Sequence, residues 1–201
     1  MRLKMNKILI FFYISFSISI AQRPITSEDI VNLKTVSQAS FHSDGSKIVY
    51  IKSIPSAKDG DKVSSFKEIW VIKSNGKDQK KYTSSSSSIR TPMWTPKGDI
   101  SYLSRNKDFD KNTQIYIIPI DGGEPSILTS HDQGIISYKW SPDGKWIAFT
   151  SKDAISEKRR KEISDGYDMI VMGEERLFTR LWIYSLKTVS YTHLRAHETV
   201  V

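Results

Sequence analysis

The four histidines are the first residues whose type and spacing could do chemistry. His193 and His197 are four residues apart, a spacing that on a helix places two imidazoles on one side, where they could bind a metal ion. Both belong to a terminal segment that we interpret below as foreign to the protein, so we predict no metal site from them. His42 lies in a polar turn and is expected to be solvated. His131 lies in a polar loop beside Asp132 and has no visible partner in the sequence.

Other catalytic and metal-binding patterns are absent from the sequence. The chain has no cysteine, which excludes disulfides, thiol nucleophiles and cysteine metal ligands. It has no Gly-x-Ser-x-Gly elbow, the motif that would hold a nucleophilic serine on a strand-to-helix turn. Asp44, Asp121 and Asp143 lie in turns and lack the dense spacing of a calcium loop. The sequence therefore predicts no catalytic residue, no cofactor and no metal site within this chain.

One local pattern occurs three times and organises the chain. Residues 140–149 indicate the end of a strand, a tight turn and the next strand, because Pro142 fixes one turn dihedral and Gly144 supplies a positive φ. Residues 94–98 and 41–45 repeat the same order, an aromatic residue followed by a four-residue turn that ends in glycine. A spacing of roughly 45 to 55 residues is typical of propellers and other repeat arrays.

Each repeat predicts four strands joined by hairpins, which is the composition of a propeller blade. The order is clearest in the second repeat, residues 93–129. The serine run at residues 84–88 would be a flexible connector between the first two repeats. We predict an all-β fold, a partial β-propeller of nearly three four-stranded blades over residues 37–188. Four tryptophans recur in its strands and are interpreted as blade packing rather than as a binding cage: Trp70, Trp94, Trp140 and Trp182.

The first 21 residues have the pattern of a secretory signal peptide. A basic start precedes an apolar run at residues 8–20, and Ser19 and Ala21 give the small-x-small pattern of a cleavage site. The apolar run is shorter than the roughly 20 residues of a membrane span. We expect cleavage after Ala21, no stable membrane anchor afterwards, and an exported protein that is periplasmic or secreted from a bacterium. Residues 22–36 would form a lead-in with a short helix that Thr26 caps.

The charge of the chain gives no support for nucleic-acid binding. The formal net charge is +8, but part of it lies in the basic start of the predicted signal peptide. The remaining excess is spread along the chain and forms no dense basic run. We therefore expect no nucleic-acid partner.

Residues 189–201 break the pattern of the third repeat. After the strand at residues 180–184, a turn and a strand ending in threonine should follow, but residues 189–199 contain neither a glycine turn nor a β-branched run. This segment resembles, residue for residue, one reading frame of a common transposase sequencing adapter. We interpret it as a sequencing artefact, and we expect the third blade to lack its fourth strand in this chain.

Four segments carry a family resemblance: residues 27–37, 44–50, 121–129 and 140–149. They resemble the start of the propeller in exported prolyl oligopeptidase family serine peptidases, which include dipeptidyl-peptidase-like and acylaminoacyl-peptidase-like members. The resemblance implies that a catalytic Ser, Asp and His lie in an α/β-hydrolase domain after the propeller. This chain would then be a truncated part of a serine peptidase that lacks the triad, and its implied role is to limit which peptides reach the active site.

The same resemblance suggests one pair of substrate-binding residues. Some dipeptidyl-peptidase relatives hold the free amine of the substrate with two glutamates from a propeller insert. Glu174 and Glu175 lie in the long insert of the third repeat. Two carboxylates beside one ammonium group would make charge-assisted hydrogen bonds. The alternative for this pair is a solvated, charged turn.

Two other functions stay open at this point. The repeat motifs are similar to those of TolB and WD40-like propellers, so the chain could belong to a TolB-like envelope propeller that binds protein partners without catalysis. A propeller that binds carbohydrate or another surface is the third reading. The N-terminal Ser-Glu-Asp segment and the long insert favour the peptidases, for which the partner would be a peptide substrate bound through the missing hydrolase domain.

Overall fold

The computed structural model describes residues 23–55, 65–105, 112–167 and 177–194. The chain divides into two compact units, Met1–Leu33 and Lys34–Val201. The cleavage site that we predict after Ala21 lies outside the described residues. Within the described ranges, no helix has both the length and the hydropathy to cross a membrane.

The first unit contains the short helix α2, Ser27–Val31. The Thr26 hydroxyl accepts a hydrogen bond from the Asp29 backbone N–H, and the Asp29 carboxylate accepts one from the Thr26 backbone N–H, which completes a capping box. Arg23 donates two hydrogen bonds of 2.6 Å to the same carboxylate. Thr26 therefore begins this helix, as its sequence predicts.

The second unit consists of antiparallel strands in three four-stranded sheets, each built from consecutive strands. We refer to these sheets as blades 1, 2 and 3. Blade 1 contains β1 (Thr35–Phe41), β2 (Lys47–Pro55), β3 (Ser65–Lys73) and β4 (Lys80–Lys81). Blade 2 contains β5 (Arg90–Trp94), β6 (Ile100–Ser104), β7 (Gln114–Ile118) and β8 (Ser126–Ile127). Blade 3 contains β9 (Ser137–Trp140), β10 (Trp146–Lys152), β11 (Thr179–Ser185) and β12 (Ser190–Leu194). The predicted all-β fold with four-stranded blades is confirmed.

The tight turn between the first two strands of each blade has one geometry in all three blades. Its glycine has a positive φ of 71° at Gly45, 91° at Gly98 and 69° at Gly144. A residue with a Cβ is strained in this region, which explains the repeated glycine in the sequence. The glycine N–H donates to the carbonyl three residues earlier in each turn: His42, Thr95 and Ser141.

The expectation that blade 3 lacks a fourth strand is wrong. β12 pairs with β11 in the register that the other blades use, so that Trp182 lies opposite His193 as Trp70 lies opposite Lys81. An edge strand is held by backbone hydrogen bonds, and these do not require a particular side-chain pattern. The turn that leads into β12 has Val189 at a φ of 53°, so a valine occupies the conformation that glycine would normally supply.

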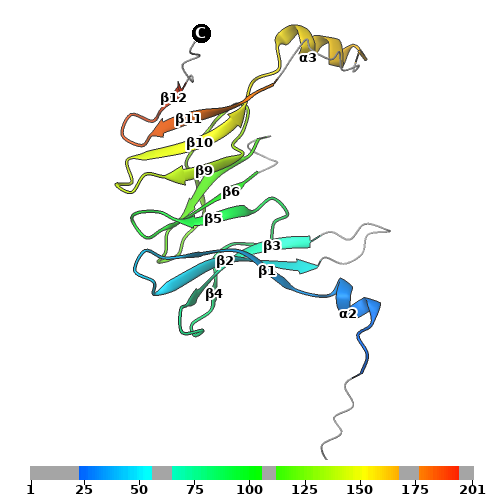
Figure 1. Cartoon of the computed structure of the whole chain (residues 1–201), viewed down its shortest axis with the longest axis vertical. Helices are drawn as coiled ribbons and strands as arrows, with labels where there is room; N and C mark the ends of the chain where they lie inside the picture. Colours follow the sequence, from blue (N-terminus) through cyan, green and yellow to red (C-terminus); the bar gives the residue numbers. More distant parts are fainter. Residues whose placement is uncertain (1–22, 56–64, 106–111, 168–176, 195–201) are drawn as a thin grey trace, which may run out of the picture. The chain divides into compact units, whose positions relative to one another are not determined.

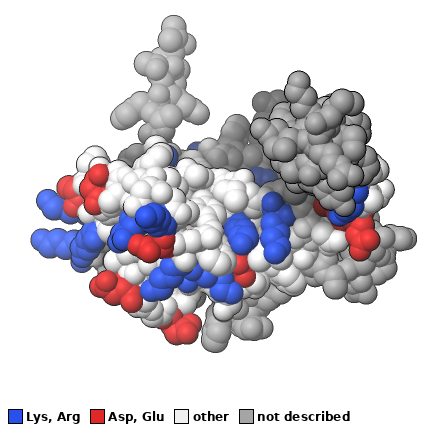
Figure 2. All heavy atoms as spheres, turned by 90° about the horizontal axis from the view of Figure 1, so that it is seen from below, with Lys and Arg blue, Asp and Glu red and all other residues white. Residues whose placement is uncertain are grey.

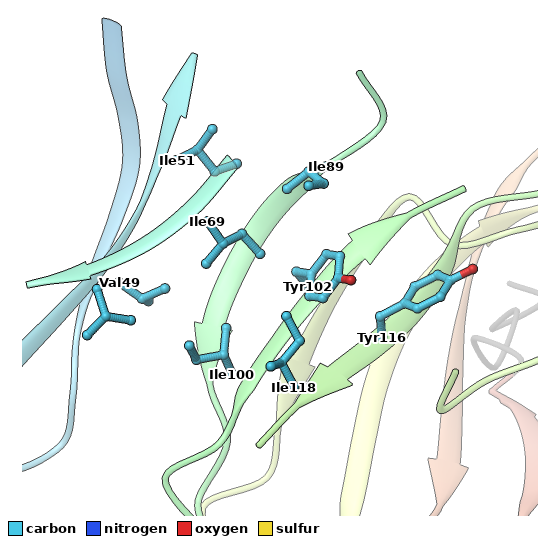
Figure 3. Close-up of a cluster of buried hydrophobic side chains, with 9 residues drawn as sticks. Val49, Ile51, Ile69, Ile89, Ile100, Tyr102, Tyr116 and Ile118 are labelled. Atoms are coloured by element: carbon cyan, nitrogen blue, oxygen red, sulfur yellow. The ribbon is translucent and has the colours of Figure 1, made fainter. Parts of the chain in front are cut away.

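The hydrophobic core lies between the blades, in two interfaces that we call seams. The side chains in each seam alternate along the strands of two facing sheets, which Figure 1 shows stacked on one another. Figure 3 shows part of the seam between blades 1 and 2, whose buried residues are Val49, Ile51, Ile69, Val71, Ile89, Ile100, Tyr102, Tyr116 and Ile118. The seam between blades 2 and 3 buries Leu103, Ile115, Ile135, Tyr138, Ile147, Phe149 and Tyr184.

Two of the recurring tryptophans link neighbouring blades by polar contacts as well as by packing. The Trp94 indole donates a 3.0 Å hydrogen bond to the Ser40 carbonyl of blade 1. The Trp140 indole donates a 2.8 Å bond to the Ser101 hydroxyl of blade 2. Trp182 packs against the seam between blades 2 and 3. These contacts support the interpretation of Trp94, Trp140 and Trp182 as blade packing, whereas the Trp70 indole donates to Glu68 within blade 1.

Candidate functional site

The connection from β10 to β11 is the insert that carries the predicted amine-binding pair. Glu174 and Glu175 themselves lie outside the described residues. The described part of the insert contains helix α3, Glu157–Ser164, whose N-terminus is capped by the Ser156 hydroxyl. In Figure 1, α3 lies beyond the ends of the strands of blade 3.

The base of the insert is held by one carboxylate. The Asp153 backbone N–H donates to the Phe178 carbonyl at 2.9 Å, and the Phe178 N–H donates back to the Asp153 carboxylate at 3.3 Å. The Arg180 guanidinium donates to the other oxygen of that carboxylate and lies over the Phe178 ring. These contacts join the two chain segments, at Asp153 and at Phe178, where the insert leaves the sheet.

His42 is packed against blade 2 rather than fully solvated as expected. Its ring meets the Trp94 ring edge-on, with centroids 4.8 Å apart, and its Nδ1 lies 2.7 Å from the Asp44 carboxylate. Bonds from Ser46 and His42 hold the pKa of Asp44 well below its usual range. The turn formed by His42 and Asp44 is thus a structural contact between blades 1 and 2.

The expectation that His131 has no partner is also wrong. Its ring lies edge-on to the rings of Phe149 and Trp182, with centroids 5.2 and 4.8 Å away, and its Nδ1 is 3.3 Å from the Ser151 hydroxyl. Burial lowers the pKa of His131 below its usual value, against the raising effect of Asp132. These partners come from blade 3, which is remote in sequence, and so the polar local sequence around His131 gave no sign of them.

The His131–Ser151 contact does not form a nucleophile and base. The Ser151 hydroxyl donates a 2.6 Å hydrogen bond to the Gly134 carbonyl, so its proton is directed at the backbone rather than at the imidazole. Among the described residues, no group of three or more His, Cys, Asp or Glu side chains could hold a metal ion. Of the two histidines spaced four residues apart, His193 lies in β12 and His197 lies outside the described residues.

A cavity of about 550 Å³ lies beside the segment that connects blade 1 to blade 2. It is lined by the serine run, by Tyr82, Tyr102 and Tyr116, and by the charged residues Arg105 and Glu124.

The serine run was expected to be a flexible connector, but it is fixed by hydrogen bonds. The Ser86 backbone pairs with Lys67, and the Ser88 hydroxyl lies 2.9 Å from that of Ser104. Since these groups bond within the protein, the serine run connects blade 1 to blade 2 structurally.

Equivalent positions at the start of the third strand carry buried polar networks in blades 1 and 2. In blade 1, the Glu68 carboxylate is 4% exposed and accepts hydrogen bonds from Trp70, Ser85 and Lys81. Burial alone would raise the pKa of Glu68, but these donors outweigh it and hold the pKa below its usual value. In blade 2, the neutral Gln114 takes this position and accepts from the Thr129 hydroxyl.

The curated proteins that this chain resembles in sequence are peptidases. The uncharacterized peptidase YuxL of Bacillus subtilis is 27% identical over 150 residues, which is 73% of this chain and 22% of that protein. Dipeptidyl-peptidase 5 of Porphyromonas gingivalis is 29% identical over 145 residues, which is 72% of this chain and 20% of that protein. No family model matches the sequence.

Solved structures show the same fold. The isopeptidase AtxE2 superposes with a TM-score of 0.63 at 15% identity, covering 88% of this chain and 33% of that one. The β-propeller domain of the trilobed protease from Pyrococcus furiosus superposes with a TM-score of 0.50 at 12% identity, covering 82% of this chain and 44% of that one. The chain has a β-propeller fold, and the curated proteins that it resembles in sequence are peptidases.

The catalytic machinery of such a peptidase is not in this propeller chain. The chain spans about a fifth of the length of the curated relatives it matches, and its sequence has no nucleophile elbow. The described residues provide blades, seams and the base of an insert. They assign no catalytic role to any residue of this propeller, and Glu174 and Glu175 stay a prediction.

Proposed function

We propose that this chain is the N-terminal propeller part of an exported serine peptidase that hydrolyses peptides. The propeller would limit which peptides reach a catalytic domain that lies later in the same protein. The observation that carries the proposal is the alignment with peptidases over nearly three quarters of the chain. The stacked four-stranded blades agree with it, because a propeller provides a rigid body with an opening of restricted width.

The proposed substrate is a short peptide with a free N-terminal amine. The name dipeptidyl-peptidase 5, given to relatives from two Porphyromonas species, supports this class. The proposed export rests on the signal-peptide pattern of residues 1–21. Glu174 and Glu175 are the proposed amine-binding residues, since carboxylates on an insert at the end of the blades could receive the ammonium group of a peptide.

The test uses the full-length protein encoded by the uninterrupted gene, that is, by the natural gene without the adapter-like residues 189–201. We expect a fluorophosphonate probe to label one serine stoichiometrically, and we expect dipeptidyl chromogenic substrates to be hydrolysed. The matched control is the same protein with the elbow serine changed to alanine, which should bind substrate and turn over none. Short peptides should be cleaved much faster than unfolded polypeptides if the propeller restricts access.

Two results would overturn the proposal. A complete, folded protein without any probe-reactive serine would exclude a serine peptidase and would favour a binding propeller. Equal cleavage of short peptides and long polypeptides would retain the peptidase but exclude the role of the propeller in restricting access.

A further inference from the structure

The two seams differ at one position of the connector between their blades. Ser85 and His131 are equivalent, since each lies two residues after a buried threonine, Thr83 or Thr129, that accepts a hydrogen bond from the third strand. In the seam between blades 2 and 3, the His131 ring packs edge-on against aromatic rings of blade 3. In the seam between blades 1 and 2, the smaller Ser85 lines the cavity of about 550 Å³. A cavity therefore lies where the other seam holds a ring.

The aromatic walls at this place have the same arrangement but different chemistry. Tyr102 pairs with Tyr116 across β6 and β7, as Phe149 pairs with Trp182 across β10 and β11. The rings of each pair are stacked, with centroids 5.6 Å apart in blade 2 and 6.3 Å apart in blade 3. Both rings of blade 2 carry a hydroxyl group, and Figure 3 shows these hydroxyls directed away from Val49. The wall of the cavity is thus polar where its counterpart is apolar.

The Tyr102 hydroxyl needs a partner that the protein does not supply. Tyr102 is 4% exposed and lines the cavity, and among the described residues its hydroxyl has no hydrogen-bond partner. Burial raises the pKa of this phenol, so the hydroxyl stays protonated and can both donate and accept. A buried hydroxyl without a partner is costly, which indicates that the cavity holds a group that hydrogen-bonds to it.

The rest of the lining offers hydroxyls and one charge of each sign. Ten of the fifteen lining residues carry a hydroxyl group. Ser84 and Ser87 are exposed, and their hydroxyls form no hydrogen bond in the part of the chain that the structure describes. Arg105 and Glu124 also line the cavity, and within the described ranges neither belongs to an ion pair. Opposite charges disfavour a ligand with a charge of one sign, and the hydroxyls disfavour an apolar ligand.

We propose that this cavity binds a small saccharide, with a sugar ring at the place that the His131 ring fills in the other seam. Sugar hydroxyls both donate and accept, so they match Tyr102 and the serines. A guanidinium such as that of Arg105 can donate to two neighbouring hydroxyls, and the Glu124 carboxylate can accept from two. The volume of about 550 Å³ lies within the range of small-molecule sites. This site does not rest on the proposed peptidase function.

Ionic ligands and extended peptides fit the molecule less well. Figure 2 shows acidic side chains interspersed among basic ones, so the face that it displays provides no field of a single sign to attract an ionic ligand. An extended peptide binds by pairing its backbone with a free strand edge. At this cavity, the Ser86 backbone already pairs with Lys67 in both directions.

The test applies the full-length protein from the uninterrupted gene to an array of immobilised mono- and disaccharides. We expect at least one saccharide to retain the protein and the same free sugar to compete. Ser85→His should weaken this binding at least about tenfold, because an imidazole would fill the cavity as His131 fills the other seam. The matched control is Ser74→His, in an exposed turn of blade 1, which should bind as the wild type does.

A second variant separates binding from folding, since Ser85→His also removes a hydrogen bond to Glu68. Tyr102→Phe removes a hydroxyl that has no partner within the described residues. It should weaken saccharide binding about tenfold and leave the urea midpoint of the unliganded protein unchanged. A lowered midpoint would mean that the hydroxyl already has a partner in the protein, which would overturn the argument for a ligand.

The remaining outcomes also overturn the proposal. If no saccharide retains the protein, then the cavity holds water only. If neither Ser85→His nor Tyr102→Phe weakens binding, then the saccharide binds elsewhere, and an equal loss in Ser74→His would show an unspecific effect. Retention on an array of short peptides, but not of saccharides, that Ser85→His abolishes would assign the cavity to peptides. Peptidase activity enters none of these readouts, so the proposed function can fail independently.

Discussion

Trp140 is one of the residues with which blade 3 contacts blade 2. Its indole packs against the seam between blades 2 and 3 and donates to the fully buried Ser101 hydroxyl. We expect Trp140→Ala to destabilise the folded chain by about 3–5 kcal/mol, the range for aromatic truncations at packed positions, because the partly buried indole loses both its packing and its hydrogen bond. The measurement is urea unfolding followed by circular dichroism.

The matched control for Trp140 is a tryptophan of the same hairpin. Trp146 is 47% exposed, so Trp146→Ala should change the free energy of unfolding by only about 0.5 kcal/mol. Equal urea midpoints for the two variants would contradict the assignment of Trp140 to the seam.

Glu174 and Glu175 are the residues with a proposed role in substrate binding. In the peptidase from the uninterrupted gene, Glu174→Gln or Glu175→Gln should raise KM for dipeptidyl substrates roughly tenfold or more, because each change removes a charge-assisted hydrogen bond to the substrate amine. The control is a substrate with an acetylated N-terminus, for which the wild type and the variants should have the same KM. An unchanged KM for the free-amine substrate would contradict the role in amine binding and would favour the alternative, a solvated, charged turn.

At the scale of elements, the three glycine turns differ in what surrounds them. A Cβ added at Gly144 would lie 3.2 Å from the Pro96 Cβ, whereas one added at Gly45 would meet no atom within 4 Å. Both glycines have a positive φ, so either alanine variant should cost about 1 kcal/mol in backbone strain. Gly144→Ala should cost more than Gly45→Ala, since the turns of blades 2 and 3 are in contact. Thermal unfolding of both variants measures the difference, and a larger loss for Gly45→Ala would contradict it.

The connection from blade 1 to blade 2 depends on the ionisation of Glu68. Because its donors hold the pKa of Glu68 below the usual value, the carboxylate stabilises the fold above that usual value, and this stabilisation is lost as the pH falls through the lowered pKa. Glu68→Gln, which copies Gln114 of blade 2, should cost about 1–3 kcal/mol at pH 7. The cost should shrink in acid, where the wild type is also neutral. A difference between the two proteins that does not change from pH 7 to pH 3 would exclude this explanation.

At the scale of the whole molecule, one threonine recurs at the same position in blades 1 and 2, and this position predicts a residue that follows β12. Thr83 and Thr129 lie fourteen residues after Ile69 and Ile115, and each accepts a hydrogen bond from the backbone N–H of that isoleucine. The same spacing from Leu181 reaches residue 195, which is an arginine in this sequence. We therefore predict that the natural gene diverges from about Val189 and encodes threonine at position 195.

Amplification of the locus from source DNA, without adapter chemistry, measures this directly. A product that still encodes Ser190-Tyr191-Thr192-His193-Leu194 would refute the artefact interpretation. The exposed apolar side chains of β1, Val36 and Phe41, predict one more property of the chain. We expect it to aggregate when it is expressed alone.

The sequence by itself determined the repeating parts of this protein. Turn glycines at Gly45, Gly98 and Gly144 and the strands that follow them are set by local backbone preferences, which act over a few residues and can be recognised in any one repeat. The repetition of this unit at a nearly constant spacing indicates a propeller. The cap of α2 at Thr26 was predictable for the same reason, because a capping box is complete within four residues.

Only the tertiary structure decided which side chains meet across the seams. His131 acquires aromatic partners from blade 3, and Glu68 acquires Ser85 from a connector that was expected to be flexible. β12 pairs by backbone hydrogen bonds on an available strand edge, although its sequence lacks a strand pattern. In each case the stabilising contact joins residues that are distant in sequence, and their proximity follows from the stacking of blades rather than from any local preference.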